Sequence, residues 1–202
     1  MAKAAVQRSP PPRRRDAVAT RAAILASAHK AFARAGYDGA GVREIAAGAG
    51  VTAMLVNRYF GSKEKLFAEV LAAAGANPTI LSRENLASSN LGEAFATALV
   101  DITRTGETPL EAFQIMLNSA SSKRAAAIGR KQIEKGHHKL LTDALTGRHA
   151  PQRAAILLAI VAGVQVMRQT IGLSALADAK PADLVEILAP ILQRLVDGDD
   201  RM

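Results

Sequence analysis

Apolar side chains recur at every third or fourth position through most of the chain, which is the spacing of one face of an α-helix. Ile24, Leu25, Ala28 and Phe32 form the first clear stripe. Gly36 follows it, as glycine often does just past a helix end. The longest helices are expected over about 17–35, 122–146, 151–172 and 181–197. The pattern therefore predicts an all-α protein of about nine helices.

Two short helical patterns meet at a glycine-containing turn in the first third of the chain. Val42, Ile45 and Ala46 lie on one face of the first pattern. Gly48-Ala49-Gly50 interrupts it, because glycine adopts positive φ at little cost. Thr52 can then cap a second helix with its hydroxyl oxygen. Two helices joined in this way are typical of a helix-turn-helix, whose second helix enters the DNA major groove.

Polar caps indicate where further helices begin. Ser62 precedes a helix whose Leu66, Phe67 and Val70 are expected to face inward. Similar starts occur at Asn90 with Glu93 and at 108–111, where a proline occupies the first helical position. The long helix over 122–146 contains glycines at 129 and 136, and we expect irregular geometry near them.

The last two helices carry the widest apolar faces. Ile156, Ile160, Val164 and Met167 repeat along one, and the other repeats Leu184, Ile187, Leu188, Ile191, Leu192 and Leu195. A homodimer built as a four-helix arrangement about a two-fold axis explains these faces; packing within one chain is the alternative. The charge-free stretch 154–167 is shorter than the roughly 20 residues of a spanning helix, so we expect a buried helix and no membrane partner.

Positive charge is concentrated in the N-terminal part of the chain. Residues 1–75 hold 12 Lys/Arg against 5 Asp/Glu, and residues 76–202 hold 14 against 13. A charge placed this way suits phosphate neutralisation. Residues 1–15 are expected to form a basic disordered tail, because prolines, arginines and small residues bury too little surface to order it. Arg13–Arg15 could enter the minor groove or could only add solubility and non-specific affinity.

Motifs at fixed spacing link residues 20–70 to a known family. They are Ala31-Phe32 with Gly36-Tyr37, Ile45-Ala46, Ala49-Gly50-Val51, Tyr59-Phe60 and Ser62-Lys63-Glu64. Through them the chain resembles the TetR family of bacterial transcriptional regulators. The resemblance implies a helix-turn-helix DNA-binding domain over 16–62 and a ligand-binding and dimerisation domain over 63–202.

Four residues are expected to hold DNA by its phosphates, which positions the protein without reading sequence. They are Arg43, Thr52, Tyr59 and Lys63. Lys63 resembles the family lysine that touches phosphate, and it stands at a helix N-terminus that favours anions. Tyr59 matches a family position whose ring packs inward while its polar end meets phosphate, and pure core packing is its alternative.

The second helix of the motif is expected to read bases through Ala53, Met54, Leu55, Asn57 and Arg58. Asn can pair with adenine and Arg with guanine, and apolar side chains suit the thymine methyl. Arg58 could equally bind phosphate, while Val56 and Phe60 are assigned to the core. Met54, Leu55 and Asn57 depart from the family pattern, so operator preference should differ there.

The expected function is that of a cytoplasmic, nucleoid-associated repressor, released from a palindromic DNA operator by an unknown small molecule. An architectural DNA-binding protein of the same fold, without a ligand switch, is the alternative. Gln114, Asn118, His137 and Arg168 are candidate ligand contacts, and the scarcity of aromatic residues favours an aliphatic pocket. The adjacent histidines at 137 and 138 point about 100° apart on a helix, so they converge on no metal. The chain lacks cysteine, and we expect neither an enzyme nor a cofactor.

Overall fold

A computed structural model describes residues 13–76, 80–104 and 111–198, and these residues form helices and turns without a strand. The α-helices are α1 (Arg13–Gly39), α2 (Val42–Gly48), α3 (Ala53–Phe60), α4 (Lys63–Ala74), α5 (Arg83–Leu86), α6 (Leu91–Ile102), α7 (Glu111–Asn118), α8 (Lys123–Ile133), α9 (Lys139–Ala144), α10 (Ala150–Gln165), α11 (Ser174–Ala177) and α12 (Pro181–Asp197). Two π-helical turns, η1 (Glu134–His138) and η2 (Val166–Thr170), follow α8 and α10. The all-α prediction is confirmed. The described helices outnumber the expected nine because α5 and α11 are single turns and η1 divides the helix over 123–144.

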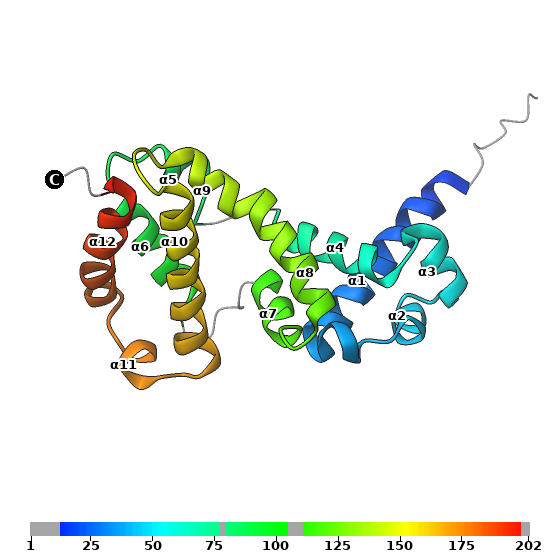
Figure 1. Cartoon of the computed structure of the whole chain (residues 1–202). Coiled ribbons are helices and arrows are strands. Elements are labelled where there is room, and N and C mark those ends of the chain that lie inside the picture. Colours follow the sequence, from blue (N-terminus) through cyan, green and yellow to red (C-terminus); the bar gives the residue numbers. More distant parts are fainter. Residues whose placement is uncertain (1–12, 77–79, 105–110, 199–202) are drawn as a thin grey trace, which may run out of the picture.

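The first hydrophobic core lies between α1, α2, α3 and α4, at one end of the elongated molecule (Figure 1). Phe32, Tyr37 and Phe67 meet at its centre, with ring centroids 5.0–6.2 Å apart. Ile115 of α7 and Ala125 of α8 complete this core, although they follow α4 by some 40 residues or more in the chain. The core that supports the helix-turn-helix therefore includes segments from both halves of the sequence.

The second hydrophobic core lies at the other end, between α6, α9, α10 and α12 (Figure 1). Phe95, Leu99, Leu157 and Leu192 are buried there among aliphatic neighbours. Helices α6 and α12 pack along each other, and the Gly92 amide donates to the Gln193 side-chain oxygen at 2.7 Å. This core contains few of the aromatic contacts that fill the first.

One long helical segment, formed by α8, η1 and α9, runs from the first core to the second (Figure 1). The irregularity expected in it occurs at Gly136, whose φ of −102° and ψ of −106° are not helical. Gly129 lies within regular α8, where it is buried against Met116. The two cores are thus joined by a helix with a defect close to the middle of its length.

Helix α1 begins earlier than the sequence predicts. Residues 13–15 form its first turn, whereas they were expected in the disordered tail; residues 1–12 lie outside the described part. Asp16 in this first turn favours the helix, since an acidic side chain complements the partial positive charge of a helix N-terminus. The regular helix ends as expected at Gly36, where φ is +64°. A Cβ at that glycine would lie 2.1 Å from the Asn118 carbonyl oxygen, so the position also requires close backbone contact.

Most of the other predicted helix ends are confirmed. Ser62 accepts from the Lys65 amide, and Asn90 accepts from the Glu93 amide while donating to its carboxylate. Helix α12 begins at Pro181 and ends at Asp197 as expected. The proposed start at 108–111 falls largely outside the described residues.

Helix α10 was expected to be buried, and the structure corrects this. With η2 it spans Ala150–Thr170 and is long and apolar enough to cross a membrane by length and composition, yet only 22% of its most apolar window is buried. Arg153 and Arg168 fold inward, which leaves the outer face free of their charge. Ile156 and Met167 on α10 and η2, and Ile187 and Ile191 on α12, are exposed. Two neighbouring helices therefore present an uncovered apolar surface.

Candidate nucleic-acid interface and effector cavity

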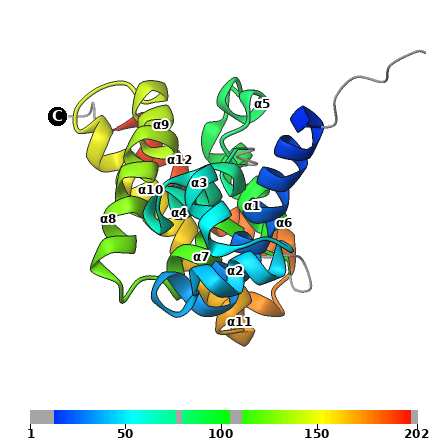
Figure 2. The ribbon, with the colours of Figure 1, turned by 90° about the vertical axis from the view of Figure 1, so that its right-hand side faces the viewer.

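The α2–turn–α3 unit has the geometry of a helix-turn-helix. The turn is held by the Val51 amide, which donates to the Ala46 carbonyl at 2.9 Å, and Gly50 adopts φ +66°. Thr52 caps α3 by accepting from the Leu55 amide at 3.3 Å, as predicted. Val56 and Phe60 anchor α3 in the first core, also as predicted. In Figure 2, turned so that this end faces the viewer, α2 and α3 lie on the near side.

The outward face of α3 consists of Met54, Asn57 and Arg58. All three are exposed, and the Met54 side chain is 79% exposed. Their spacing of three and four residues places them on one side of the helix. Ala53 and Leu55, the other two predicted base readers, are only partly exposed, and Ala53 packs against the core. The structure therefore brings three of the five predicted readers together on the open surface.

The predicted phosphate contacts lie around this face. Arg43 on α2 and Thr52 at the start of α3 are exposed, whereas Tyr59 and Lys63 are half-buried. The Lys63 ammonium lies 4.6 Å from the centre of the Tyr37 ring, which attracts the cation through its π face. Lys63 stands in the first turn of α4, whose N-terminal amides favour an anion.

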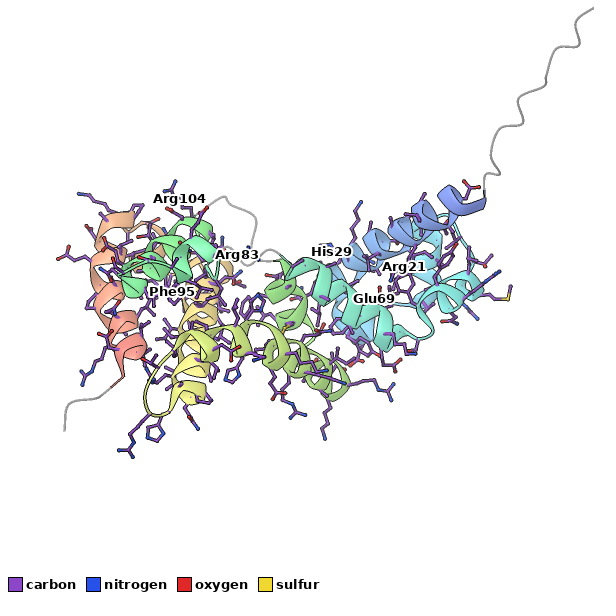
Figure 3. All side chains as sticks on the ribbon, turned by 90° about the horizontal axis from the view of Figure 1, so that it is seen from above. Arg21, His29, Glu69, Arg83, Phe95 and Arg104 are labelled. Carbon is purple, nitrogen blue, oxygen red and sulfur yellow. The ribbon has the colours of Figure 1, made fainter. Side chains whose placement is uncertain are left out.

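Glu64 connects the base of α4 to α8. Hydrogen bonds from its own backbone amide and from Ser62, followed by the nearby Arg124, lower the pKa of the Glu64 carboxyl. Arg124 of α8 donates to this carboxylate at 2.8 Å. Burial, and then the negative charge of Glu64, raise the pKa of the Tyr37 hydroxyl. A second ion pair, Arg21 with Glu69, ties α1 to α4 (Figure 3). The helix that leads away from the DNA-facing surface is thereby held at its first turn and at its middle.

A cavity of about 240 Å³ lies between the two cores. On one side it is lined by the end of α4 and by α7, which pack on the first core, and on the other by α6, α9, α10 and α12. Its lining is almost entirely apolar: Ala74, Gly75, Ile80, Leu81, Phe95, Ile102, Ala112, Phe113, Met116, Ile133, His137, Leu141, Leu157, Leu158, Val161, Ala162, Gln165 and Leu192. Both phenylalanines from the C-terminal part of the sequence are among them, within the mainly aliphatic wall that was predicted.

Among the described lining residues, only His137 and Gln165 have polar groups in their side chains. Gln165 is 1% exposed, and neither atom of its amide has a hydrogen-bond partner among the described residues. His137 is half-buried, and burial lowers the pKa of its imidazole. Buried polar groups in proteins are almost always hydrogen-bonded, so the Gln165 amide can donate and accept hydrogen bonds toward the cavity.

Three of the four predicted ligand contacts lie outside this cavity. Gln114 donates to Asn118, which in turn donates to the Ala33 carbonyl of α1 at 2.6 Å. Arg168 is buried, and its guanidinium donates to the Val100 and Leu176 carbonyls and to the Thr103 hydroxyl. Asn118 and Arg168 thus join helices that are distant in the chain, and Gln114 bonds to Asn118 within α7. His137 does line the cavity, and Gln165 was missed, although a lone amide within the charge-free stretch 154–167 was a signal for it.

Two family models match the chain. The model "Bacterial regulatory proteins, tetR family" matches residues 24–70, which include α2, α3 and most of α4. The model "Tetracyclin repressor-like, C-terminal domain" matches residues 89–196, more than half of the chain. No curated protein sequence matches the chain.

Solved structures of similar fold include several regulators. A TetR-family regulator from Streptomyces coelicolor A3 has 25% identity and a TM-score of 0.60, and the match covers 92% of this chain and 99% of that one. A transcriptional regulator from Rhodococcus sp. Rha1 has 23% identity and a TM-score of 0.61, over 88% and 98% of the two chains. The multidrug binding protein EbrR, complexed with malachite green, has 20% identity and a TM-score of 0.61, over 93% and 100%. With its helix-turn-helix and both family domains in place, the chain belongs to the tetR family of bacterial transcriptional regulators.

Proposed function

We propose that the protein is a homodimeric repressor that leaves its palindromic DNA operator when a small molecule fills the cavity between the two cores. The observation that carries the proposal is the position of this cavity, with the end of α4 and part of α7 in its wall. These helices pack on the core that supports the helix-turn-helix. A ligand that requires a wider cavity would therefore act on the part that contacts DNA.

The switch needs no more than a difference in ligand affinity between two arrangements of the molecule. A ligand shifts an equilibrium only by its differential affinity for the two states. In this proposal residues 16–62 bind DNA, residues 63–202 bind the ligand and the second copy, and the protein acts in the cytoplasm at the nucleoid. Relatives bound to proflavin and malachite green support a small-molecule effector. An architectural DNA-binding protein would have no use for such a cavity.

Homodimerisation is proposed through the exposed face of α10 and α12. Ile187 is 61% exposed and Ile191 48% exposed, and Ile156 on α10 is also 48% exposed. Such a face on two adjacent helices suits a four-helix arrangement about a two-fold axis. Two-fold symmetry in the protein then matches two half-sites in the operator.

The dimer is tested by the double variant Ile187→Glu/Ile191→Glu. Carboxylates on this face should give monomers in sedimentation experiments and abolish tight operator binding. Leu140→Glu, at a partly exposed leucine on α9, is the control and should remain dimeric. A double variant that still sediments as a dimer would overturn this interface.

The DNA contacts are tested after selecting bound sites from random DNA. Asn57→Ala should change base preference at particular operator positions, whereas Lys63→Ala should weaken binding to every sequence about equally. Arg83→Ala, on α5 outside the helix-turn-helix, is the control for loss of one positive charge. If both Asn57→Ala and Lys63→Ala weaken binding with no change in preference, the assignment of readers is wrong.

The ligand switch is tested by screening for compounds that release the selected operator. Ala162→Phe should fill part of the cavity, so this variant should still bind operator but should no longer be released by a compound active on the wild type. Release that is unchanged in Ala162→Phe would place the effector elsewhere.

A further inference from the structure

The lining of the cavity also restricts the chemistry of its ligand. We propose that the cavity binds an uncharged, mainly apolar molecule carrying one group that both donates a hydrogen bond to the Gln165 amide and accepts one from it, such as a carboxamide or a hydroxyl. This inference rests on the proposed function, because it concerns the same cavity. The ligand class is inferred from this cavity and is not taken from the relative's complexes with proflavin and malachite green.

The described part of the wall disfavours a charged ligand. Among the described lining residues there is no lysine, arginine, aspartate or glutamate. An ion moved from water into such a site loses its hydration and gains no partner, and the cost of that transfer is large. The imidazole of His137 does not alter this, because burial lowers its pKa and so favours the neutral ring near neutral pH.

The size of the cavity sets the size of the ligand. An engineered cavity of about 150 Å³ in another protein holds benzene, so about 240 Å³ corresponds to roughly ten non-hydrogen atoms. Phe95, Phe113 and Met116 with the surrounding aliphatic residues provide an apolar surface for the body of such a molecule. A compact ring with one polar substituent fits this volume.

The polar substituent is specified by Gln165. Its side-chain oxygen can only accept and its nitrogen can only donate, and both are without a partner among the described residues. A ligand that satisfies both must therefore offer a donor and an acceptor close together. A carboxamide does this with two parallel hydrogen bonds, and a hydroxyl does it with one atom. His137 adds a second neutral hydrogen-bonding group to the wall.

Three probes of similar shape test the proposal: cyclohexanecarboxamide, cyclohexanecarboxylate and cyclohexylmethylammonium. Each is titrated into full-length protein with labelled methyl groups, and the NMR signal of the Met116 methyl reports from the cavity wall. The carboxamide should shift this signal saturably and bind at least about tenfold more tightly than either ion. A charged probe that binds as tightly as the carboxamide overturns the proposal, as does a carboxamide that shows no binding.

The variant Gln165→Met keeps the length of the side chain and removes both hydrogen-bonding groups. Since no described partner depends on them, the variant should fold, which its methyl spectrum also reports. Its affinity for the carboxamide should fall about tenfold, which corresponds to one neutral hydrogen bond. Gln152→Met, an exposed position on the same helix, is the matched control and should bind like the wild type. An unchanged affinity in Gln165→Met contradicts the proposed role of the amide.

Operator release is measured separately by fluorescence anisotropy, so that the two proposals fail independently. Selective carboxamide binding that leaves the operator bound supports the ligand class and overturns the release mechanism for that probe. If a charged compound releases the operator and shifts the Met116 signal over the same concentration range, the proposed release mechanism is supported. The proposal of an uncharged ligand is then overturned.

Discussion

The two cores of this protein are built differently, one around aromatic rings behind the helix-turn-helix and the other around aliphatic side chains beside a cavity. The core behind α3 is closed by three aromatic rings, with Phe67 fully buried between Phe32 and Tyr37. The core between α6, α10 and α12 is mainly aliphatic, and a cavity opens along the side that faces α4 and α7. Tight packing gives the helix-turn-helix a fixed shape, whereas the cavity leaves space beside the other core, as the proposed ligand switch requires.

Both regions have local helix caps, and the second region adds a long-range one. Around the DNA-reading surface, Thr52 and Ser62 cap the helices that follow them directly in the chain. In the second region, Arg153 donates to the Leu195 and Val196 carbonyls at the end of α12, some 40 residues away. Local caps can be recognised in a sequence, and long-range ones cannot.

The largest expected effect comes from breaking the filled core. Phe67→Ala should cost about 3–5 kcal/mol of unfolding free energy and abolish operator binding, because it removes the ring at the centre of the cluster. Phe95→Ala should cost clearly less, since Phe95 already borders empty space and has fewer neighbours to lose. Denaturant titrations of both variants test this. Equal costs would show that the two cores are equally well packed.

A smaller loss is expected from Arg153→Met, which keeps the aliphatic stem and removes the guanidinium. This group donates to four carbonyls, of Thr146, Arg148, Leu195 and Val196, and the variant leaves them unpaired. The expected cost is about 2–4 kcal/mol. Arg194→Met on the exposed side of α12 is the control and should change stability little. If thermal and chemical unfolding give the same stability for Arg153→Met and Arg194→Met, the Arg153 guanidinium does not stabilise the end of α12.

Ser62→Ala should cost about 1 kcal/mol, because the hydroxyl caps the twelve-residue helix α4. Ser82→Ala removes a cap of the same type from α5, which has only four residues, and should cost less. The comparison of unfolding midpoints shows whether local caps matter more in the DNA-reading region. A larger loss in Ser82→Ala would reverse that conclusion.

The smallest expected effect is the loss of stability that protonation of His137 causes at acidic pH. Burial lowers the pKa of His137 below its value in the unfolded chain, so the unfolded state takes up this proton first as pH falls. Stability should therefore decrease from about pH 7.5 to about pH 5.5, and His137→Leu should show a shallower decrease. Melting temperatures measured at both pH values test this. Identical slopes for wild type and variant would mean that burial does not affect His137 in solution.

The features that the sequence could predict are those that depend on local contacts. The caps at Thr52 and Ser62, the glycine turn and the inward Val56 and Phe60 depend on neighbours within one or two helical turns, and they were predictable. For Gln165 the sequence offers only the signal of a lone amide in a charge-free stretch, because the lack of a hydrogen-bond partner depends on helices distant in the chain.

Three of the four predicted ligand contacts lie outside the cavity for the same reason. The sequence favours Arg168 and Asn118 as ligand contacts because they are polar residues on helices. In the structure both donate hydrogen bonds to carbonyls of helices far away in the chain. The helix α10 was expected to be buried because it is apolar. Its outer face is open within one chain, and the two arginines that flank the charge-free stretch turn inward and leave this face without their charge.

The contact between Gly36 and α7 limits how regulators of this kind can be recombined. The Tyr37 amide donates to the Ser119 hydroxyl, and a side chain at Gly36 would collide with the Asn118 carbonyl. A chimera that joins residues 1–75 to the remainder of another regulator would lose these contacts and the buried Ile115. A transplantable DNA-reading unit therefore has to be discontinuous and must carry the segment from α7 to the start of α8 with it.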